Sequence, residues 1–175
     1  ITKLIENKLS LYSIHTSFDN LKNGLNFELG RVLNLKNQKK LIPKKNTLMK
    51  ITSYVPSDYL DEVLNSLYEA GAGEIGNYSK CSFSAKGEGR YLGGKESSPK
   101  FGNKGGLTKT PEIFISLVFP SYKKKKVIEN LIKSHPYESA AYEITNIDNY
   151  NPDLGLGSIG VLPRSMNEKE FLEYL

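Results

Sequence analysis

A histidine and an aspartate just after an apolar run are the residues best placed to do chemistry in this chain. His15 and Asp19 follow residues 9–14, an apolar stretch that is typical of a strand. A neutral imidazole and a carboxylate at a strand end can converge on one divalent cation. A zinc site takes about three or four protein ligands, however, and this segment offers two. The pair is therefore either a surface turn with local hydrogen bonds, or part of a metal site whose other ligands lie elsewhere.

Composition narrows the class of protein. The 175 residues, 38% hydrophobic and 25% charged, suit one ordinary domain or two small ones. The single cysteine, Cys81, excludes an internal disulfide framework and a thiolate zinc cluster, and it suits a reducing compartment. No apolar run approaches the roughly 20 residues that span a bilayer, and the first residues lack a signal-peptide pattern. We therefore expect a cytoplasmic protein with no membrane partner.

The net charge of +5 raises the question of nucleic acid. Much of the lysine excess lies in residues 36–45 and 123–126, where no aromatic residues alternate with the cations. Such clusters are typical of a solvated linker and of a solvated helix face. Nucleic-acid binding is therefore disfavoured.

The middle of the chain has the pattern of a compact α+β unit. Residues 23–35 predict an amphipathic helix, and the polar, basic residues 34–46 predict a linker or domain boundary. The following elements alternate in type: strand 48–55, helix 57–70, an extended arm or hairpin over 78–92, strand 112–119, helix 121–134 and strand 140–144. This order predicts a ferredoxin-like βαββαβ unit over 47–148. Two helices would cover one sheet face and leave the other apolar, so we expect self-association.

The ends of the chain carry two further signals. Alternate glycines over 154–163 predict a close-packed strand or turn, and a capping box at 165–168 predicts a helix whose apolar residues point inward. The chain begins at Ile1 within one helical pattern and stops at Leu175 within another. We therefore expect a segment of a longer protein.

For other candidate functional residues, a structural explanation is available as an alternative. His135 and Glu138 follow the second helix, where an imidazole suits the negative helix end; alternatively, either residue contacts a metal or ligand. Cys81 is interpreted as a small apolar residue. The sequence Gly87-Glu88-Gly89 is interpreted as a bulge or turn.

Four strings, taken together and in order, resemble one family. They are residues 11–19 (LYSIHTSFD), 71–83 (GAGEIGNYSKCSF), 135–138 (HPYE) and 155–160 (GLGSIG). The chain resembles the Nif-three-like dinuclear metal-binding family, whose members are often labelled GTP cyclohydrolase 1 type 2 homologs. It is similar to the long bacterial form, in which a PII-like, CutA-like domain interrupts the metal-binding core.

The resemblance implies an α/β fold with an α+β insert. The truncated core would comprise residues 1–46, with the His-Thr-x-x-Asp motif, and residues 149–175, and the ferredoxin-like insert would comprise 47–148. It also implies a homohexamer built from trimers and dimers. Ser139 stands where the family commonly has a second glutamate, which weakens an acidic pair there.

The resemblance also implies two divalent metal ions per complete subunit, of zinc, iron or manganese. His15 would be a terminal ligand, and Asp19, with two oxygens, would bridge the ions. The remaining ligands would lie upstream and downstream of these residues. This chain alone would then lack a complete centre and would be inactive as an enzyme.

Three functional hypotheses remain. The first is a metal-dependent hydrolase acting on a nucleotide-like or other small substrate. The alternative is a regulatory or interaction protein with a structural metal, in which the insert senses a small-molecule ligand. The third is a folded scaffold without autonomous activity.

Overall fold

A computed structural model describes all residues, 1–175, and the chain divides into two compact units. The split unit comprises Ile1–Lys44 and Asn151–Leu175, and the inserted unit comprises Lys45–Tyr150. The boundaries expected from the sequence are 46/47 and 148/149. No helix in either unit is long and apolar enough to cross a membrane.

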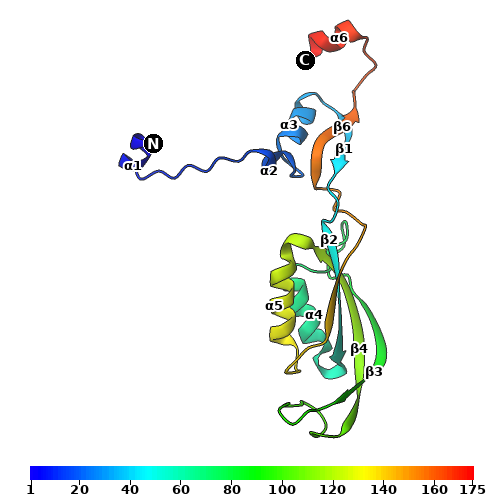
Figure 1. Cartoon of the computed structure of the whole chain (residues 1–175). Coiled ribbons are helices and arrows are strands. Elements are labelled where there is room, and N and C mark those ends of the chain that lie inside the picture. The colour runs from blue at the N-terminus through cyan, green and yellow to red at the C-terminus, as the bar shows by residue number, and fades with distance from the viewer. The chain divides into compact units, whose positions relative to one another are not determined.

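The inserted unit is built on a four-stranded antiparallel sheet (Figure 1). Its strands lie in the order β3-β4-β2-β5. With one helix after β2 and one after β4, this is the ferredoxin-like βαββαβ arrangement, so the fold class expected from the sequence is confirmed. The strands are β2 (Leu48–Pro56), β3 (Phe83–Leu92), β4 (Leu107–Pro120) and β5 (Tyr142–Asn146).

Two helices pack side by side on one face of this sheet (Figure 1). They are α4 (Leu60–Glu69) and α5 (Lys124–Ser134), each preceded by a single 3-10 turn, η1 (Ser57–Tyr59) and η2 (Ser121–Lys123). A proline ends the strand before each turn, because proline has no amide hydrogen to continue a ladder. Each helix buries apolar residues one turn apart, which gives the amphipathic stripe that the sheet covers.

The register of β2 against β4 decides what enters the core. Ile51 pairs with Leu117 and Val55 with Ile113, and all four side chains are buried beneath the helices. The twelve buried hydrophobic residues of the chain all belong to the inserted unit. They are Ile51, Val55, Val63, Leu67, Ala70, Ala72, Ile113, Ile115, Leu117, Phe119, Val127 and Leu131.

The intervening residues of these strands point to the opposite, open face, because side chains alternate along a strand. This face carries aromatic rings from Tyr54 and Phe114, but also Lys50, Thr52 and Glu143. Thr52 Oγ1 donates to Glu143 Oε2 at 3.0 Å. The expectation of an apolar open face is therefore wrong, since the face is mixed.

Strand β3 differs from the expected arm. It is one ten-residue strand, paired with β4 without interruption from Phe83 opposite Ser116 to Leu92 opposite Leu107. The bulge or turn expected at Gly87-Glu88-Gly89 is wrong, because both glycines lie within the regular ladder. Their missing side chains therefore need another explanation.

The split unit contains a two-stranded antiparallel sheet of β1 (Lys36–Pro43) and β6 (Gly155–Val161). A linker or domain boundary was expected over 34–46; most of this segment is β1 and not a linker, and the division between the two units falls at Lys44/Lys45. A polar strand forms here because its partner supplies the ladder from more than 100 residues away in sequence. The close packing expected of the glycines in β6 holds at Gly155, where a side chain would overlap the carbonyl oxygen of Ile42.

Four helices complete the split unit. They are α1 (Thr2–Glu6), α2 (Thr16–Asp19), α3 (Leu25–Val32) and α6 (Glu168–Tyr174). The strand expected over 9–14 is wrong, because no partner strand pairs with it. The capping box also begins at another residue: Asn167 accepts from the Glu170 amide at 3.0 Å, and Glu170 accepts from the Asn167 amide at 3.1 Å.

Two neighbouring residues of α5 test where the stability of the inserted unit comes from. Leu131 is fully buried and Ile132 is 54% exposed. Leu131→Ala leaves a cavity and should lower the free energy of unfolding by about 2–5 kcal/mol. Ile132→Ala should change it by less than about 1 kcal/mol. Urea denaturation followed by circular dichroism measures both, and equal losses would contradict this packing.

Candidate functional site

The structure places His15 and Asp19 at the two ends of the one-turn helix α2. His15 is the residue before the first turn, is exposed, and makes no capping hydrogen bond. Asp19 is the last residue of the helix and is partly buried. Its carbonyl oxygen accepts from Asn26 Nδ2 and from Lys40 Nζ, both at 3.4 Å. Both hydrogen bonds hold the main chain at Asp19, and neither involves the Asp19 carboxylate.

A lysine from β1 sets the charge around this helix. Lys40 Nζ also donates to the carbonyl oxygen of Leu21. Burial lowers the pKa of Lys40, and the nearby carboxylates of Asp153 and Asp19 oppose that shift by favouring the ammonium form. The ammonium thus supplies positive charge beside Asp19, where a metal ion would compete with it.

These residues alone do not fit a complete metal centre. Nowhere in the chain do three His, Cys, Asp or Glu side chains gather closely enough to hold a metal ion. His15 and Asp19 are two donors, whereas a stable site needs about three or four. The metal-ligand roles of His15 and Asp19 stay predictions.

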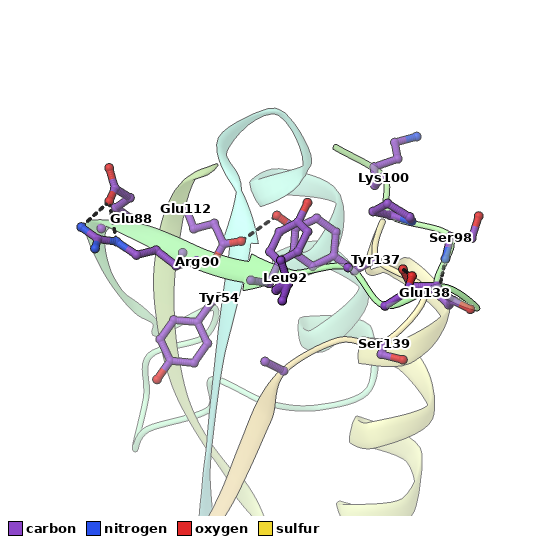
Figure 2. A pocket seen from close by; sticks show the side chains of 18 of the residues that line it. Tyr54, Glu88, Arg90, Leu92, Ser98, Lys100, Glu112, Tyr137, Glu138 and Ser139 are labelled. Carbon is purple, nitrogen blue, oxygen red and sulfur yellow. Dashed lines mark hydrogen bonds and ion pairs between the residues drawn. The ribbon is translucent and has the colours of Figure 1, made fainter. Parts of the chain in front are cut away.

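A second candidate site is a pocket of about 590 Å³ on the open face of the inserted unit (Figure 2). Its walls come from β2, β3, β4, the loop after β3 and the segment after α5. The lining residues are Tyr54, Gly87, Glu88, Gly89, Arg90, Tyr91, Leu92, Gly93, Gly94, Ser97, Ser98, Pro99, Lys100, Glu112, Phe114, Tyr137, Glu138, Ser139 and Ala141.

The two glycines of β3 create this space. Gly87 pairs with Glu112 and Gly89 with Thr110, so both glycines lie on the open face beside the pocket. A Cβ added at Gly89 would overlap the carboxylate of Glu112. The absence of two side chains from one strand thus hollows the sheet surface and makes room for the carboxylate.

A buried carboxylate lies at the inner end of the pocket. Glu112 is 7% exposed, and Tyr137 Oη donates to its Oε1 at 2.6 Å (Figure 2). Burial, followed by the hydrogen bond and charge of Glu112, raises the pKa of Tyr137 well above its usual range. The buried Thr110 hydroxyl opposes this shift in part, although it makes no hydrogen bond of good geometry. Tyr137 is therefore a fixed proton donor to Glu112.

The structure separates His135 from Glu138. The His135 imidazole is 6% exposed and both ring nitrogens contact main chain: Nε2 lies 2.9 Å from Tyr54 O, and Nδ1 accepts from Tyr137 N at 3.2 Å. That pattern assigns the ring proton to Nε2 and ties the end of α5 to β2. His135 is thus explained as a structural residue. Glu138 instead lines the pocket, where its Oε2 accepts from the Ser98 amide at 2.7 Å.

The loop after β3 closes one side of the pocket through its own hydrogen bonds. Gly105 N donates to Gly93 O at 2.8 Å, and Tyr91 Oη donates to Phe101 O at 2.7 Å. The Tyr137 ring meets those of Tyr91 and Phe101 edge to face. This cluster holds the loop against the segment that carries Tyr137.

Four residues of this pocket were not expected as site residues from the sequence: Tyr54, Glu112, Phe114 and Tyr137. Two signals for them exist in the sequence. A charged Glu112 begins a run of apolar strand residues, and two glycines alternate within β3 at positions that share one face. Both signals become visible only once the pairing of β3 with β4 is known.

The fold defines a class: an α/β chain interrupted by a ferredoxin-like unit. The chain belongs to the Duf34/NIF3 (NGG1p interacting factor 3) family, whose model matches residues 1–175. The family expected from the sequence is thereby confirmed.

Relatives and a solved structure agree with this membership. The chain is 39% identical over 172 residues to a protein of Halalkalibacterium halodurans and 37% identical over 172 residues to one of Bacillus subtilis, both named GTP cyclohydrolase 1 type 2 homolog. Each match covers 98% of this chain and 46% of the relative. A Bacillus cereus protein related to NIF3 superposes with a TM-score of 0.83 at 36% identity, over 99% of this chain and 46% of that one. The chain thus spans about half the length of these relatives.

The burial of His135 predicts how pH acts on the inserted unit. Burial lowers the pKa of His135 below the usual 6.5, which outweighs the opposing effects of Tyr54 and Glu112. The unfolded chain therefore takes up a proton first as the pH falls. The contribution of His135 to stability should be complete above pH 6.5 and decline below it.

Urea unfolding at a series of pH values from neutral into the acid range measures this decline. His135→Gln should flatten the dependence below pH 6.5. The matched control His15→Gln, at an exposed position, should retain it. An unchanged slope in His135→Gln would show that other groups cause the dependence.

Proposed function

We propose that this chain contributes His15 and Asp19 to a dinuclear metal centre in a larger, metal-dependent hydrolase. The observation that carries the proposal is membership of the Duf34/NIF3 family together with the His-Thr-x-x-Asp pattern held on α2. The relatives' name, GTP cyclohydrolase 1 type 2 homolog, supports a nucleotide-like or other small substrate. The remaining ligands would come from parts of the full-length protein outside these residues.

Two divalent ions, of zinc, iron or manganese, would bind per complete subunit. Such a pair supplies a hydroxide nucleophile near neutral pH and stabilises developing negative charge. In the proposed centre His15 would be a terminal ligand and Asp19 would be a bridging one. The Lys40 ammonium, which donates to the main-chain carbonyl of Asp19, would add positive charge beside this centre.

We also propose that the full-length protein is a homohexamer built from trimers and dimers, in which inserted units meet. Two features of the inserted unit support contact between copies. Strand β3 is a ten-residue edge strand whose outer side has no ladder partner, and the open face exposes Phe83 at 65%. Sedimentation at micromolar concentration should give six times the subunit mass, and a monomer would contradict the assembly.

The second candidate function is ligand sensing by the inserted unit, with a structural metal elsewhere. The pocket beside Glu112 favours it, because the inserted unit alone builds that pocket. A ligand bound there would act by stabilising one arrangement of this unit or of its assembly.

Substitution at Asp19 tests the metal proposal in the full-length protein. Asp19→Ala removes the proposed bridging ligand, so we expect the metal content to fall from two ions per subunit to one or none. Hydrolysis of GTP and related compounds should fall by roughly 100-fold or more, because the nucleophile depends on the metal pair. Elemental analysis and phosphate or product release measure the two effects.

Asp153→Ala is the matched control. Asp153 is another carboxylate beside Lys40 and forms an ion pair with Lys22 at 3.0 Å, but has no proposed metal role. The control should keep its metal and activity. Full metal content together with unchanged activity in Asp19→Ala would refute the centre.

A further inference from the structure

We propose that the pocket of the inserted unit binds a flat, nitrogen-containing small molecule through N–H donors directed at Glu112. The proposal adds a site and a ligand class to the proposed ligand-sensing function. The biological role of binding rests on that function, whereas binding itself does not.

One of the two carboxylate oxygens of Glu112 accepts no hydrogen bond from the chain. Tyr137 Oη serves Oε1, whereas Oε2 lies over Gly89 and accepts no hydrogen bond. Glu112 also forms no ion pair. Thr110 Oγ1 is the one side-chain oxygen or nitrogen that is shut off from solvent without a hydrogen-bond partner, so Oε2 of Glu112 is accessible from the pocket and can receive a ligand donor in place of water. The inner end of the pocket is therefore complementary to a cation or to paired N–H groups.

The cations nearest the pocket are engaged elsewhere. Arg90 pairs with Glu88 at 2.9 Å, and both side chains are at least half exposed at the rim. Lys100 Nζ lies 5.5 Å from the centre of the Tyr59 ring. Neither side chain satisfies the buried carboxylate, as Figure 2 shows for Arg90, which points toward Glu88. Oε2 of Glu112 is thus left free for a donor from a bound molecule.

The walls suit a flat molecule. Tyr54 and Phe114 lie side by side on the open face, with ring centroids 5.7 Å apart. Tyr91 and Tyr137 add a second pair of rings with centroids 6.1 Å apart. A volume of about 590 Å³ is that of a pocket for a compact organic ligand. Aromatic walls with one buried acceptor favour a planar ring that carries its donors on one edge.

Amidines, guanidines and the donor edge of a guanine base share this chemistry. Each presents two N–H groups side by side, the geometry that pairs with the two oxygens of a carboxylate, and Oε1 retains a second lone pair beside its bond to Tyr137. Carboxylates and phosphates at the inner end would meet the charge of Glu112. Anionic groups of a larger ligand would have to remain at the rim, near Lys100.

Benzamidine and guanosine are the probes, and the full-length protein is the receptor. Titration followed by calorimetry should show saturable binding of one molecule per subunit for at least one probe, whereas benzoate, the anion of similar shape, should not bind. Binding by benzamidine alone would identify a cationic amidine or guanidine class. Binding by guanosine would identify a nucleobase.

Two variants locate the binding. Glu112→Gln keeps the size of the side chain and removes its charge, so it should weaken binding by roughly 10-fold to 100-fold. Gly89→Ala fills the space beside the carboxylate and should abolish binding. The controls are Glu143→Gln, on the same sheet face but outside the pocket, and Gly106→Ala, whose new methyl would meet no atom closer than 3.7 Å. Both controls should bind normally.

The outcomes separate this proposal from the functions above. Absence of binding by both probes, or equal binding by Glu112→Gln, would overturn the pocket proposal and leave the metal proposal unaffected. Binding that depends on Glu112 but changes neither assembly nor hydrolysis would support the pocket and contradict sensing. Thermal unfolding of each variant distinguishes a loss of binding from a loss of the folded structure.

Discussion

The alignment of β2 with β4 is the constraint on which the inserted unit depends. Nine consecutive residue pairs, from Leu48 opposite Pro120 to Pro56 opposite Glu112, direct alternate side chains to opposite faces. A shift by one residue would exchange those faces, expelling Ile51 and Val55 from beneath the helices and burying Tyr54 instead. The hydrophobic gain from the helix-covered face therefore also fixes the position of Glu112 and Phe114 on the other. Core and pocket are two results of one register.

Much of this architecture was predictable because its signals are local. The apolar alternation in β2 and β4 and the helical spacing in α4 and α5 each fall within a dozen or so residues, and a proline marks the end of both strands. Strand β1 was not predictable in this way. Its lysines and polar residues resemble a linker, and only its distant partner β6 makes it a strand. Residues 9–14 show the converse, since an apolar pattern without a partner strand forms none.

The two candidate sites also differ in whether their signals are local in the sequence. His15 and Asp19 lie four positions apart in one short segment, so they can be singled out from the sequence, and their role as metal ligands stays a prediction. The pocket joins residues from Tyr54 to Ala141, which no short motif contains. Its clearest trace, two glycines in alternate positions, has several ordinary explanations until the ladder shows which face they share. A site that is assembled by long-range strand pairing thus has no short sequence motif by which it can be recognised.

The pairing of β2 with β5 also bears on how a chain with such an insertion can fold. Residues of β1 and β6 are separated by more than 100 positions, and closing a loop of that length costs conformational entropy. Once Met49–Ser53 pairs with Tyr142–Asn146, the two ends of the inserted unit lie on adjacent strands. The effective loop between β1 and β6 then shrinks to a few residues on each side. A folded inserted unit would therefore lower the entropic cost of bringing β1 and β6 together.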